Sequence, residues 1–428
     1  MQNMTSKEKN YTLPIIMMFA LFFMISFVTG LQNPMGIIVK NQFGASNFMS
    51  QLGNAANFIA YAFMGIPAGI LLQKIGYKKT ALLAIIIGFL GVGIQYLSGG
   101  MESFATYLTG AFVSGFSMCM LNTVVNPMLN TLGGGGKKGN ILLQLGGSIN
   151  SIGATIVPVL VGYLIGNASR ATIKEANPAL FLAMGIFILA FLVLLFVKIP
   201  EPYLDKKEKV KSKYSAFSFR HFCLGVIAIF IYVGIEVGIP NTANLYMTSD
   251  TDKGGLGIDT TIAGTVVGTY WFLMLIGRLI GASLGARVSS KTMLTFTSSL
   301  GLIFILLAII SPISTTVSMP VFKSDISLGF AKLPITIVFF ILCGLCTSVM
   351  WGGIFNLAVE GLGKFTSAAS GIFMMMVCGG GILPLIQNYF ADLTGFLSSF
   401  WLVIIEFAFI LYYALIGSKN VNKNIPVD

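Results

Sequence analysis

The sequence predicts an all-α integral membrane protein whose twelve transmembrane helices form two pseudo-symmetric six-helix bundles. First, 55% of its 428 residues are hydrophobic and only 10% are charged, a balance unlike that of a soluble domain. Second, mostly apolar runs of about 20 residues recur along the whole chain, and each is long enough to cross a bilayer as a helix. Third, one basic, soluble stretch divides these runs into two sets of six.

The first half holds runs at residues 13–39, 49–73, 80–98, 104–132, 141–165 and 179–198. The first run follows two lysines, as in a signal peptide, but it is too long, contains polar residues and precedes no small-residue cleavage pattern. We therefore expect it to be kept as the first helix. The second half holds runs at residues 222–247, 260–285, 293–311, 333–359, 367–390 and 396–416. Glycine-rich segments before basic turns, at 65–76 and 275–288, repeat weakly and favour duplication of one six-helix unit.

The predicted divisions are an N-terminal bundle (1–198), a cytoplasmic linker (199–219), a C-terminal bundle (220–417) and a cytoplasmic tail (418–428). Lysine and arginine concentrate in the linker and in every second loop, which places both termini in the cytoplasm. The net charge of +11 is scattered between the apolar runs instead of forming a basic stripe. Nucleic acid is therefore not expected as a partner.

Metal, nucleotide and enzyme chemistry are not expected either. The five cysteines lie within apolar runs, and the pair Cys343 and Cys346 has no second pair or histidine nearby. The glycine-rich segment 133–139 fails the phosphate-loop pattern, since Thr131 replaces its first glycine and Lys138 its serine or threonine. No histidine cluster, nucleophile elbow or pair of acids lies at membrane depth. We expect no cofactor and no metal, with energy drawn from gradients.

Polar residues interrupt the apolar runs at a few places. Asn122 and Asn126 in the segment LNTVVNP would lie at hydrocarbon depth, where amides need partners in a protein interior or a wet cavity. Pro34 and Pro240 break corresponding helices of the two halves and free backbone carbonyls toward a cavity, unless they only kink the helices. These places predict a binding site between the halves.

Several motifs, in order, resemble those of a known family. The segment GILLQKIGYKK at 69–79 resembles the loop signature of the major facilitator superfamily, although Gln73 replaces its aspartate. Further motifs are similar to those of the fucose:proton symporter family, which includes glucose/galactose transporters. They are LNTVVNP, NSIGA at 150–154, YVGIE at 232–236, IGR at 276–278, and FNLAVEGLGK followed by GGGI at 379–382.

The resemblance implies a major facilitator fold and a secondary transporter that moves a small neutral sugar by alternating access around a midplane site. This chain also departs from the family pattern at a few positions. Asn33 and Asn122 occupy two positions where fucose-type members carry titratable acids, and an amide cannot carry the proton. Gly147 replaces a family glutamine, while Asn150 is kept. Proton-coupled, sodium-coupled and uncoupled transport of a sugar therefore all stay open, with a non-transporting sugar sensor or a channel less favoured.

A sugar presents hydroxyl groups and flat C–H faces, so amides and aromatic rings suit a sugar site. In the second helix, polar residues recur every three or four positions from Gln51, which favours a cavity lining over polar contacts between helices. The predicted substrate-binding residues are Asn33, Asn54, Asn57, Tyr61, Asn122, Asn126, Gln144, Asn150, Asn241, Trp271, Trp351, Asn356 and Gln387.

Few acids lie within the apolar runs. A carboxylate near the bilayer centre costs about 2.5 to 3.5 kcal/mol on insertion scales, so Glu236 is predicted to carry the coupling proton or cation. The alternative is a buried ion pair between Glu236 and Arg278. The predicted gating residues are Lys78, Lys79, Arg278 and Glu360, and Glu406 has no assigned role.

Together these features predict a monomeric transporter of the bacterial cytoplasmic (inner) membrane, surrounded by the lipid bilayer. Its expected partners are a small sugar and a proton or sodium ion. The sequence does not identify the sugar, since stereochemistry depends on the geometry of the site.

Overall fold

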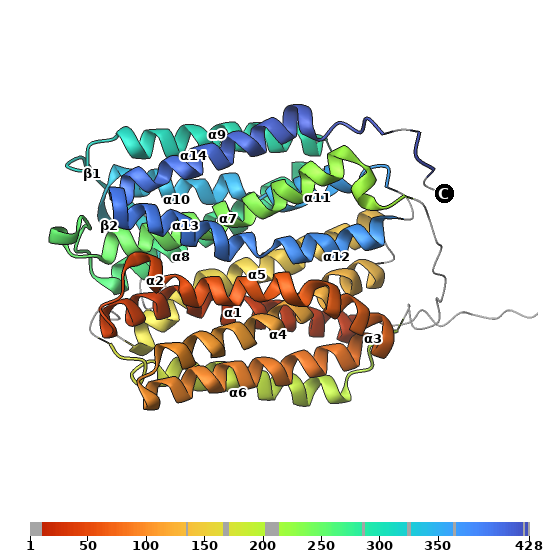
Figure 1. The fold of residues 1–428 in the computed structure, drawn as a ribbon, viewed down its shortest axis with the longest axis horizontal. Helices are drawn as coiled ribbons and strands as arrows, with labels where there is room; N and C mark the ends of the chain where they lie inside the picture. Colours follow the sequence, from red (N-terminus) through yellow and green to blue (C-terminus); the bar gives the residue numbers. More distant parts are fainter. Residues whose placement is uncertain are drawn as a thin grey trace, which may run out of the picture.

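The structure, a computed structural model, describes residues 11–133, 136–165, 171–201, 214–284, 287–322, 327–362, 365–422 and 424–426, apart from some side chains within them. Long helices run side by side along the molecule, with the elements up to α6 in one half and those from α7 onward in the other (Figure 1). One end carries α2 and a β-hairpin, and we call it the hairpin end. The opposite end carries the C-terminal segment, and we call it the linker end.

The first half is built from α1 (Thr12–Gln42), α2 (Asn47–Ser50), α3 (Leu52–Met101), α4 (Phe104–Leu132), α5 (Gly136–Ile165) and α6 (Asn177–Phe196). Within α3 the chain turns at Gly76, whose φ of 84° lies in the region that favours glycine. The Glu201 carboxylate accepts hydrogen bonds from the backbone N–H groups of Tyr77 (2.6 Å) and Lys78 (3.0 Å). This turn divides α3 into two membrane-crossing segments, as the sequence predicts.

The second half is built from α7 (Arg220–Thr248), α8 (Thr260–Leu284), α9 (Ser290–Ile310), α10 (Ile335–Thr347), α11 (Met350–Val359), α12 (Thr366–Met376), α13 (Gly379–Thr394) and α14 (Phe396–Tyr412). A five-residue π-turn, Tyr413–Gly417, extends α14, and short 3-10 turns lie at Ala216–Ser218 and Thr251–Lys253. The predicted tenth and eleventh helices are each broken once, between α10 and α11 and between α12 and α13. Such breaks interrupt the helical hydrogen bonds near the middle of a span and leave backbone groups for other partners.

A hairpin that the sequence did not predict connects α9 to α10. Strand β1 (Thr316–Phe322) pairs antiparallel with β2 (Leu328–Pro334), with Val317 opposite Leu333. Side chains of residues 316–321 alternate between exposed and at least partly buried, with the period of two that is typical of a strand. From sequence alone, this segment is expected to be a connection between two membrane spans. The predicted tenth span therefore starts too early: Leu333 belongs to β2, and helix α10 begins after Pro334 because proline ends the strand.

The described residues contain eleven helical segments long and apolar enough to cross a membrane, and α5 adds a shorter apolar stretch, Leu145–Val157. With α5 they match the twelve predicted runs in order. The peripheral helices α6, α9 and α14 expose large apolar side chains, among them Phe196, Phe296 and Ile405. Apolar side chains on the outer surface suit a lipid environment, so the chain is a multi-pass membrane protein.

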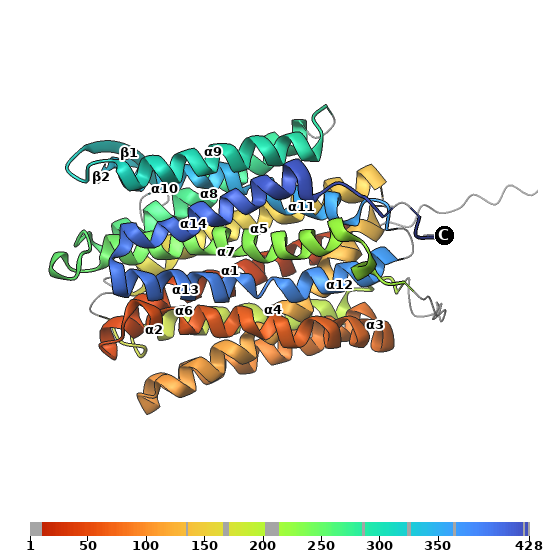
Figure 2. The same cartoon turned by 45° about the horizontal axis from the view of Figure 1, so that its top comes forward.

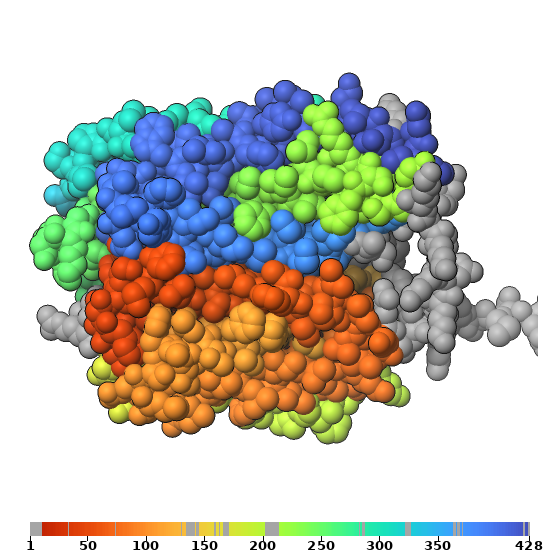
Figure 3. Space-filling view, viewed as in Figure 1, coloured from red at the N-terminus to blue at the C-terminus, as the bar shows by residue number. Residues whose placement is uncertain are grey.

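The largest contacts between the halves involve two helices of the first half. Helix α5 packs on α8, and α3 packs on α12 and α13. The two helices of each cross-contact stay adjacent when the molecule is turned (Figures 1 and 2). In the space-filling view the blue surface of the second half lies directly against the red and orange surface of the first (Figure 3). Side chains on α3, α5, α7, α8 and α13 are thereby placed where the two halves meet.

Close helix packing inside the first half depends on Gly115. A Cβ atom at this position would collide with the carbonyl oxygen of Asn57 and lie 2.7 Å from the Cβ of Ala60. We expect Gly115→Ala to lower the unfolding temperature, because overpacking costs about 1 to 3 kcal/mol and outweighs the gain in helix propensity. The matched change Gly93→Ala, at a glycine with open space around it, should leave that temperature unchanged or raise it. Equal thermal shifts for the two purified variants would contradict the packing argument.

Candidate functional site

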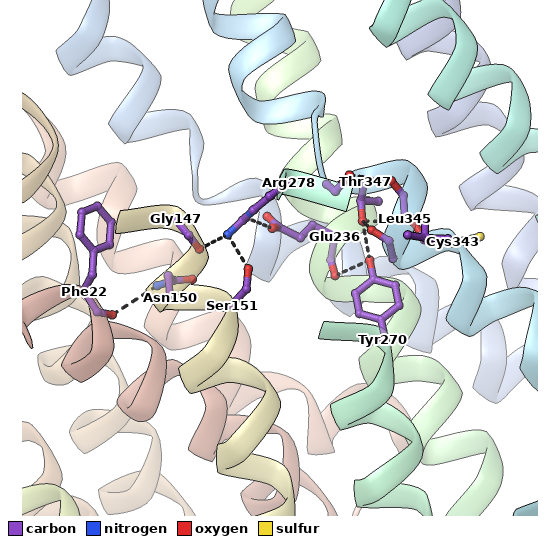
Figure 4. A network of polar contacts seen from close by, with 12 residues as sticks. Phe22, Gly147, Asn150, Ser151, Glu236, Tyr270, Arg278, Cys343, Leu345 and Thr347 are labelled. Atoms are coloured by element: carbon purple, nitrogen blue, oxygen red, sulfur yellow. Dashed lines mark hydrogen bonds and ion pairs between the residues drawn. The ribbon is translucent and has the colours of Figure 1, made fainter. Parts of the chain in front are cut away.

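A network of charged and polar groups connects the two halves near the middle of the helices (Figure 4). Arg278 on α8 donates from Nη1 to the carbonyl oxygen of Gly147 (2.5 Å) and to the Ser151 hydroxyl (2.7 Å), both on α5. Its Nη2 atom lies 3.3 Å from Oε1 of Glu236 on α7. The ion pair is largely buried, with side-chain exposures of 13% and 14%. A single guanidinium thus connects an acid of the second half to the backbone of the first.

The glycine at position 147 leaves room for this contact. A Cβ atom there would lie 3.6 Å from Nη1 of Arg278, an ordinary van der Waals contact, so a side chain at this position would border the guanidinium. The resemblance noted above implies a glutamine at this position in the related symporters. In this chain Gly147 has no side chain beside the guanidinium, which binds its backbone carbonyl oxygen.

Pro240 explains how the Glu236 segment is held. In a regular helix the carbonyl of residue 236 would accept from the N–H of residue 240, but proline has no N–H. The Tyr270 hydroxyl on α8 donates to the Glu236 carbonyl oxygen (3.2 Å) and contacts the Thr347 hydroxyl on α10 (3.1 Å). The carbonyl freed by Pro240 is therefore bound by a tyrosine that positions the helix turn carrying the Glu236 carboxylate.

Pro384 frees a second carbonyl at the contact between the halves. It removes the helical N–H partner of the Gly380 carbonyl in α13. The Asn54 side chain on α3 donates to this oxygen (3.0 Å). Asn241 on α7 donates to Oε1 of Gln51, the residue before α3 (3.2 Å). Asn54 and Asn241 are both buried. In this conformation these two predicted binding residues therefore form hydrogen bonds between the halves instead of facing an open cavity.

The asparagines of LNTVVNP form a cluster with Tyr61 inside the first half. Asn122 donates to the Tyr61 hydroxyl (3.0 Å) and to the Met118 carbonyl oxygen (3.1 Å), while Asn126 donates to the Asn122 carbonyl oxygen (2.8 Å). Asn122 and Asn126 are half-buried, and the Tyr61 ring stacks on Phe58 at a centroid distance of 5.9 Å. Amides beside a stacked aromatic pair offer both kinds of contact that a sugar needs.

Asn57 does not line a cavity, in contrast to the prediction for the polar residues of the second helix. It is fully buried against α4, where its Nδ2 donates to the Ala111 carbonyl oxygen (3.2 Å) and to the Ser114 hydroxyl (3.3 Å). Asn57 and Tyr61 both lie on the side of α3 that contacts α4, whereas Asn54 contacts α13 of the second half. Its placement matches the alternative interpretation, a polar contact between helices.

The other predicted binding residues have varied surroundings. Asn150 is half-buried and donates to the Phe22 carbonyl oxygen (3.5 Å), and Gln387 is buried with no hydrogen-bond partner for Nε2 among the described residues. Trp271 and Trp351 are half-buried, beside Tyr270 and Tyr232 at centroid distances of 5.3 and 6.3 Å, whereas Asn356 is exposed. The side chains of Asn33 and Gln144 lie outside the described residues.

The predicted gating residues are not brought together. The Lys78 ammonium donates to the carbonyl oxygens of Leu195 (2.8 Å) and Val197 (2.9 Å), which keeps it within the first half. Lys79 and Glu360 are exposed, and Lys364, the expected neighbour of Glu360, lies outside the described residues. Only Arg278 of this set bonds across the two halves among the described residues.

Sequence reasoning missed several residues of the network. Tyr270 and Thr347 are ordinary polar residues of apolar runs that no motif marks, and Ser151 lies in the NSIGA motif but was not predicted to contact Arg278. Tyr270 could have been found from Pro240, because a freed carbonyl requires a donor from a neighbouring helix. Asn388, buried and bonded to Thr242 (3.0 Å), is a further polar residue beside the predicted Gln387.

Charged residues near the midpoint of a helical bundle, with polar contacts between two halves, are typical of membrane transport proteins that alternate between conformations. The sequence profile of the Major Facilitator Superfamily matches residues 18–383. The chain belongs to this superfamily, and its relatives place it with the glucose/galactose transporters and fucose–proton symporters.

The relatives match along nearly the whole chain. A glucose/galactose transporter of Brucella abortus is 31% identical, over 97% of each chain. The L-fucose-proton symporter of Escherichia coli is 24% identical, over 91% of this chain and 89% of the relative. The crystal structure of the transporter FucP in an outward conformation superimposes with a TM-score of 0.70 at 21% identity, covering 96% of this chain and all of that one. The predicted family and fold are confirmed, and the relatives are transporters rather than enzymes.

Proposed function

We propose that the protein imports a small neutral sugar, a hexose or a related monosaccharide, by alternating access across the bacterial inner membrane. The names of the relatives support a sugar, since they are a glucose/galactose transporter and an L-fucose-proton symporter. The cluster of Asn122, Asn126 and Tyr61 in the first half supports a neutral substrate, because it offers amides and an aromatic ring and no charged group. The protein acts as a monomer, with both termini in the cytoplasm and residues 199–219 joining its two bundles.

The observation that carries the proposal is the contact of Arg278 with both halves. In the proposed cycle the Glu236 carboxylate holds the guanidinium while Arg278 binds the α5 backbone. Protonation of Glu236 removes the negative charge and with it the ion pair. The strength of the contact between Arg278 on α8 and the backbone of α5 therefore depends on whether Glu236 is protonated. Coupling through Glu236 replaces the two acids that Asn33 and Asn122 cannot supply.

Substrate binding is assigned to half-buried polar and aromatic side chains on α4, α5 and α8. Asn122 and Asn126 present amides from α4, Asn150 presents one from α5, and Trp271 presents a ring from α8. Sugar hydroxyls would exchange hydrogen bonds with the amides while the ring covers a C–H face. Gln387 carries an unpaired, buried amide donor on α13, a group that gains by binding a hydroxyl or an ordered water molecule.

Uptake into proteoliposomes tests the proposal. Labelled glucose, galactose and fucose would be offered with an imposed proton gradient, with a sodium gradient and with none. We expect saturable uptake of one of these sugars, with accumulation only under the proton gradient. Binding without counterflow exchange would overturn the transport assignment, whereas exchange that no gradient can drive uphill would leave a uniporter. Accumulation with sodium alone would assign the coupling to sodium.

Uniport is the second candidate, and one contact favours it. Asn122 donates to Tyr61 from the position where fucose-type relatives carry an acid, and an amide there holds the same geometry without titrating. Facilitated diffusion would need only the binding and gating contacts. The ion pair of Glu236 with Arg278 would then serve to position α5 and α8.

Restoring the acid gives a direct prediction. In Asn122→Glu the new carboxyl would lie beside the Tyr61 hydroxyl at membrane depth, where its charged form is disfavoured. We expect sugar counterflow to become pH-dependent, falling roughly tenfold or more between low and high pH because each pKa unit is a factor of ten. Asn122→Gln, which has the same size and no charge, should show no new pH dependence. The same pH profile in both variants would contradict the placement of Asn122.

A further inference from the structure

A second set of contacts joins the two halves at the hairpin end, away from the predicted gating residues. Lys40 lies in the last turn of α1 and belongs to the first half. Its ammonium donates to Asn47 Oδ1 of α2 (2.7 Å) and to the hydroxyl of Ser249, which follows α7 in the second half (2.7 Å). One lysine thus bonds to side chains of both halves.

Asp392 of α13 completes the contact from the second half. Its two carboxylate oxygens accept from the backbone N–H groups of Asn47 (3.0 Å) and Phe48 (2.8 Å). Asn47 is therefore bound through its side chain by Lys40 and through its backbone by Asp392. The short α2 lies against α13 at this end of the molecule (Figure 1).

Aromatic contacts accompany the charged ones. The Phe48 ring packs edge-on against Tyr389 of α13 at a centroid distance of 5.8 Å. The Lys40 ammonium lies 5.9 Å above the ring of Phe396, the first residue of α14. Each of these pairs joins the first half to the second, so polar and apolar contacts lie together over a small area.

We propose that Lys40, Asn47, Ser249 and Asp392 form an outer latch that closes the outward pathway of the transporter and must open in each cycle. The inference rests on the alternating access and orientation of the proposed function, in which the hairpin end faces outward. A large separation of the halves at this end would break the bond from Lys40 to Ser249 and both bonds to Asp392, while the bond between Lys40 and Asn47 lies within the first half and could persist. Closing the latch excludes water and substrate from the outside while the opposite side opens.

The contacts are suited to reversible opening. Asp392 is exposed and Lys40 is half-buried, so water can take over their hydrogen bonds when the halves separate. Hydrogen bonds to charged groups are stronger than neutral ones when they are protected from water, and exposed charged pairs contribute less. Loss of one charged partner is therefore expected to shift the equilibrium toward the open form by about fivefold to tenfold.

A cross-linking experiment tests the latch without any sugar. Cysteines would replace Phe48 and Tyr389 in the full-length chain reconstituted in liposomes. The rate of oxidative cross-linking would then report the fraction of molecules whose outer side is closed. Adding Asp392→Ala should lower this rate about fivefold to tenfold, since two backbone N–H groups lose their acceptor. Lys40→Met should lower it independently, from the other half.

Matched controls use an ion pair within one half. Glu102→Gln and Lys174→Met each remove one partner of the ion pair between these two residues (3.8 Å), which lies within the first half. Both controls should leave the cross-linking rate unchanged. Failure of the cysteine pair to cross-link, or unchanged rates in both latch variants, would overturn the latch. Since no substrate is present, a wrong sugar or coupling ion would not alter these outcomes.

Discussion

Arg278→Met is expected to lower sugar transport by roughly 10²-fold or more. The change leaves the Glu236 carboxylate without its partner at membrane depth and removes both hydrogen bonds from α8 to α5. Removing one partner of a buried ion pair costs about 3 to 5 kcal/mol, which corresponds to a factor of about 10² to 10⁴ in a population. The measurement is initial counterflow in proteoliposomes, normalised to the amount of folded protein.

Arg287→Met is the matched control, because Arg287 follows α8 and is exposed. It removes the same charge without touching the contact between the halves, and transport should stay close to that of the unmodified protein. Arg278→Lys should restore little, since an ammonium cannot reproduce the fork that binds Glu236 and α5 together. Near-normal counterflow in Arg278→Met would show that the network is not required for alternation.

Glu236→Gln is expected to abolish accumulation while counterflow exchange continues. The amide keeps the shape of the side chain but cannot bind and release a proton. Arg278 keeps its two bonds to α5 in this variant, so the binding site and the alternation persist. Uptake driven by an imposed proton gradient, compared with exchange at equal sugar concentrations, separates the two activities.

Glu102→Gln controls for loss of a carboxylate, because Glu102 is exposed and its distance to Lys174 is 3.8 Å. Combining Glu236→Gln with Arg278→Met adds a second test. Replacing both partners removes the unpaired charge, so the double variant should unfold at a higher temperature than Arg278→Met alone. Accumulation retained in Glu236→Gln would rule out this carboxylate as the proton carrier and favour uniport.

Much of the fold follows from local sequence. The apolar runs predict where helices cross the membrane because their length must match the hydrocarbon thickness. Eleven segments of the described residues are long and apolar enough, and α5 contains a shorter apolar stretch, Leu145–Val157. The hairpin at 316–334 was missed because a strand pair is specified by its partner as well as by its own alternation. The proline positions also predict freed carbonyls, as Pro240 and Pro384 illustrate.

By itself, the sequence determined the membrane class, the family and the presence of polar residues at depth, since composition and helical period are properties of the chain alone. Only the tertiary structure decided which of those residues meet. It directs Asn57 into a contact with α4, brings Arg278 to the α5 backbone, and joins Lys40 to Ser249 across 209 positions of sequence. The physical reason is that each partner depends on how the helices pack against one another, and helical period does not specify which neighbouring helix a face will contact.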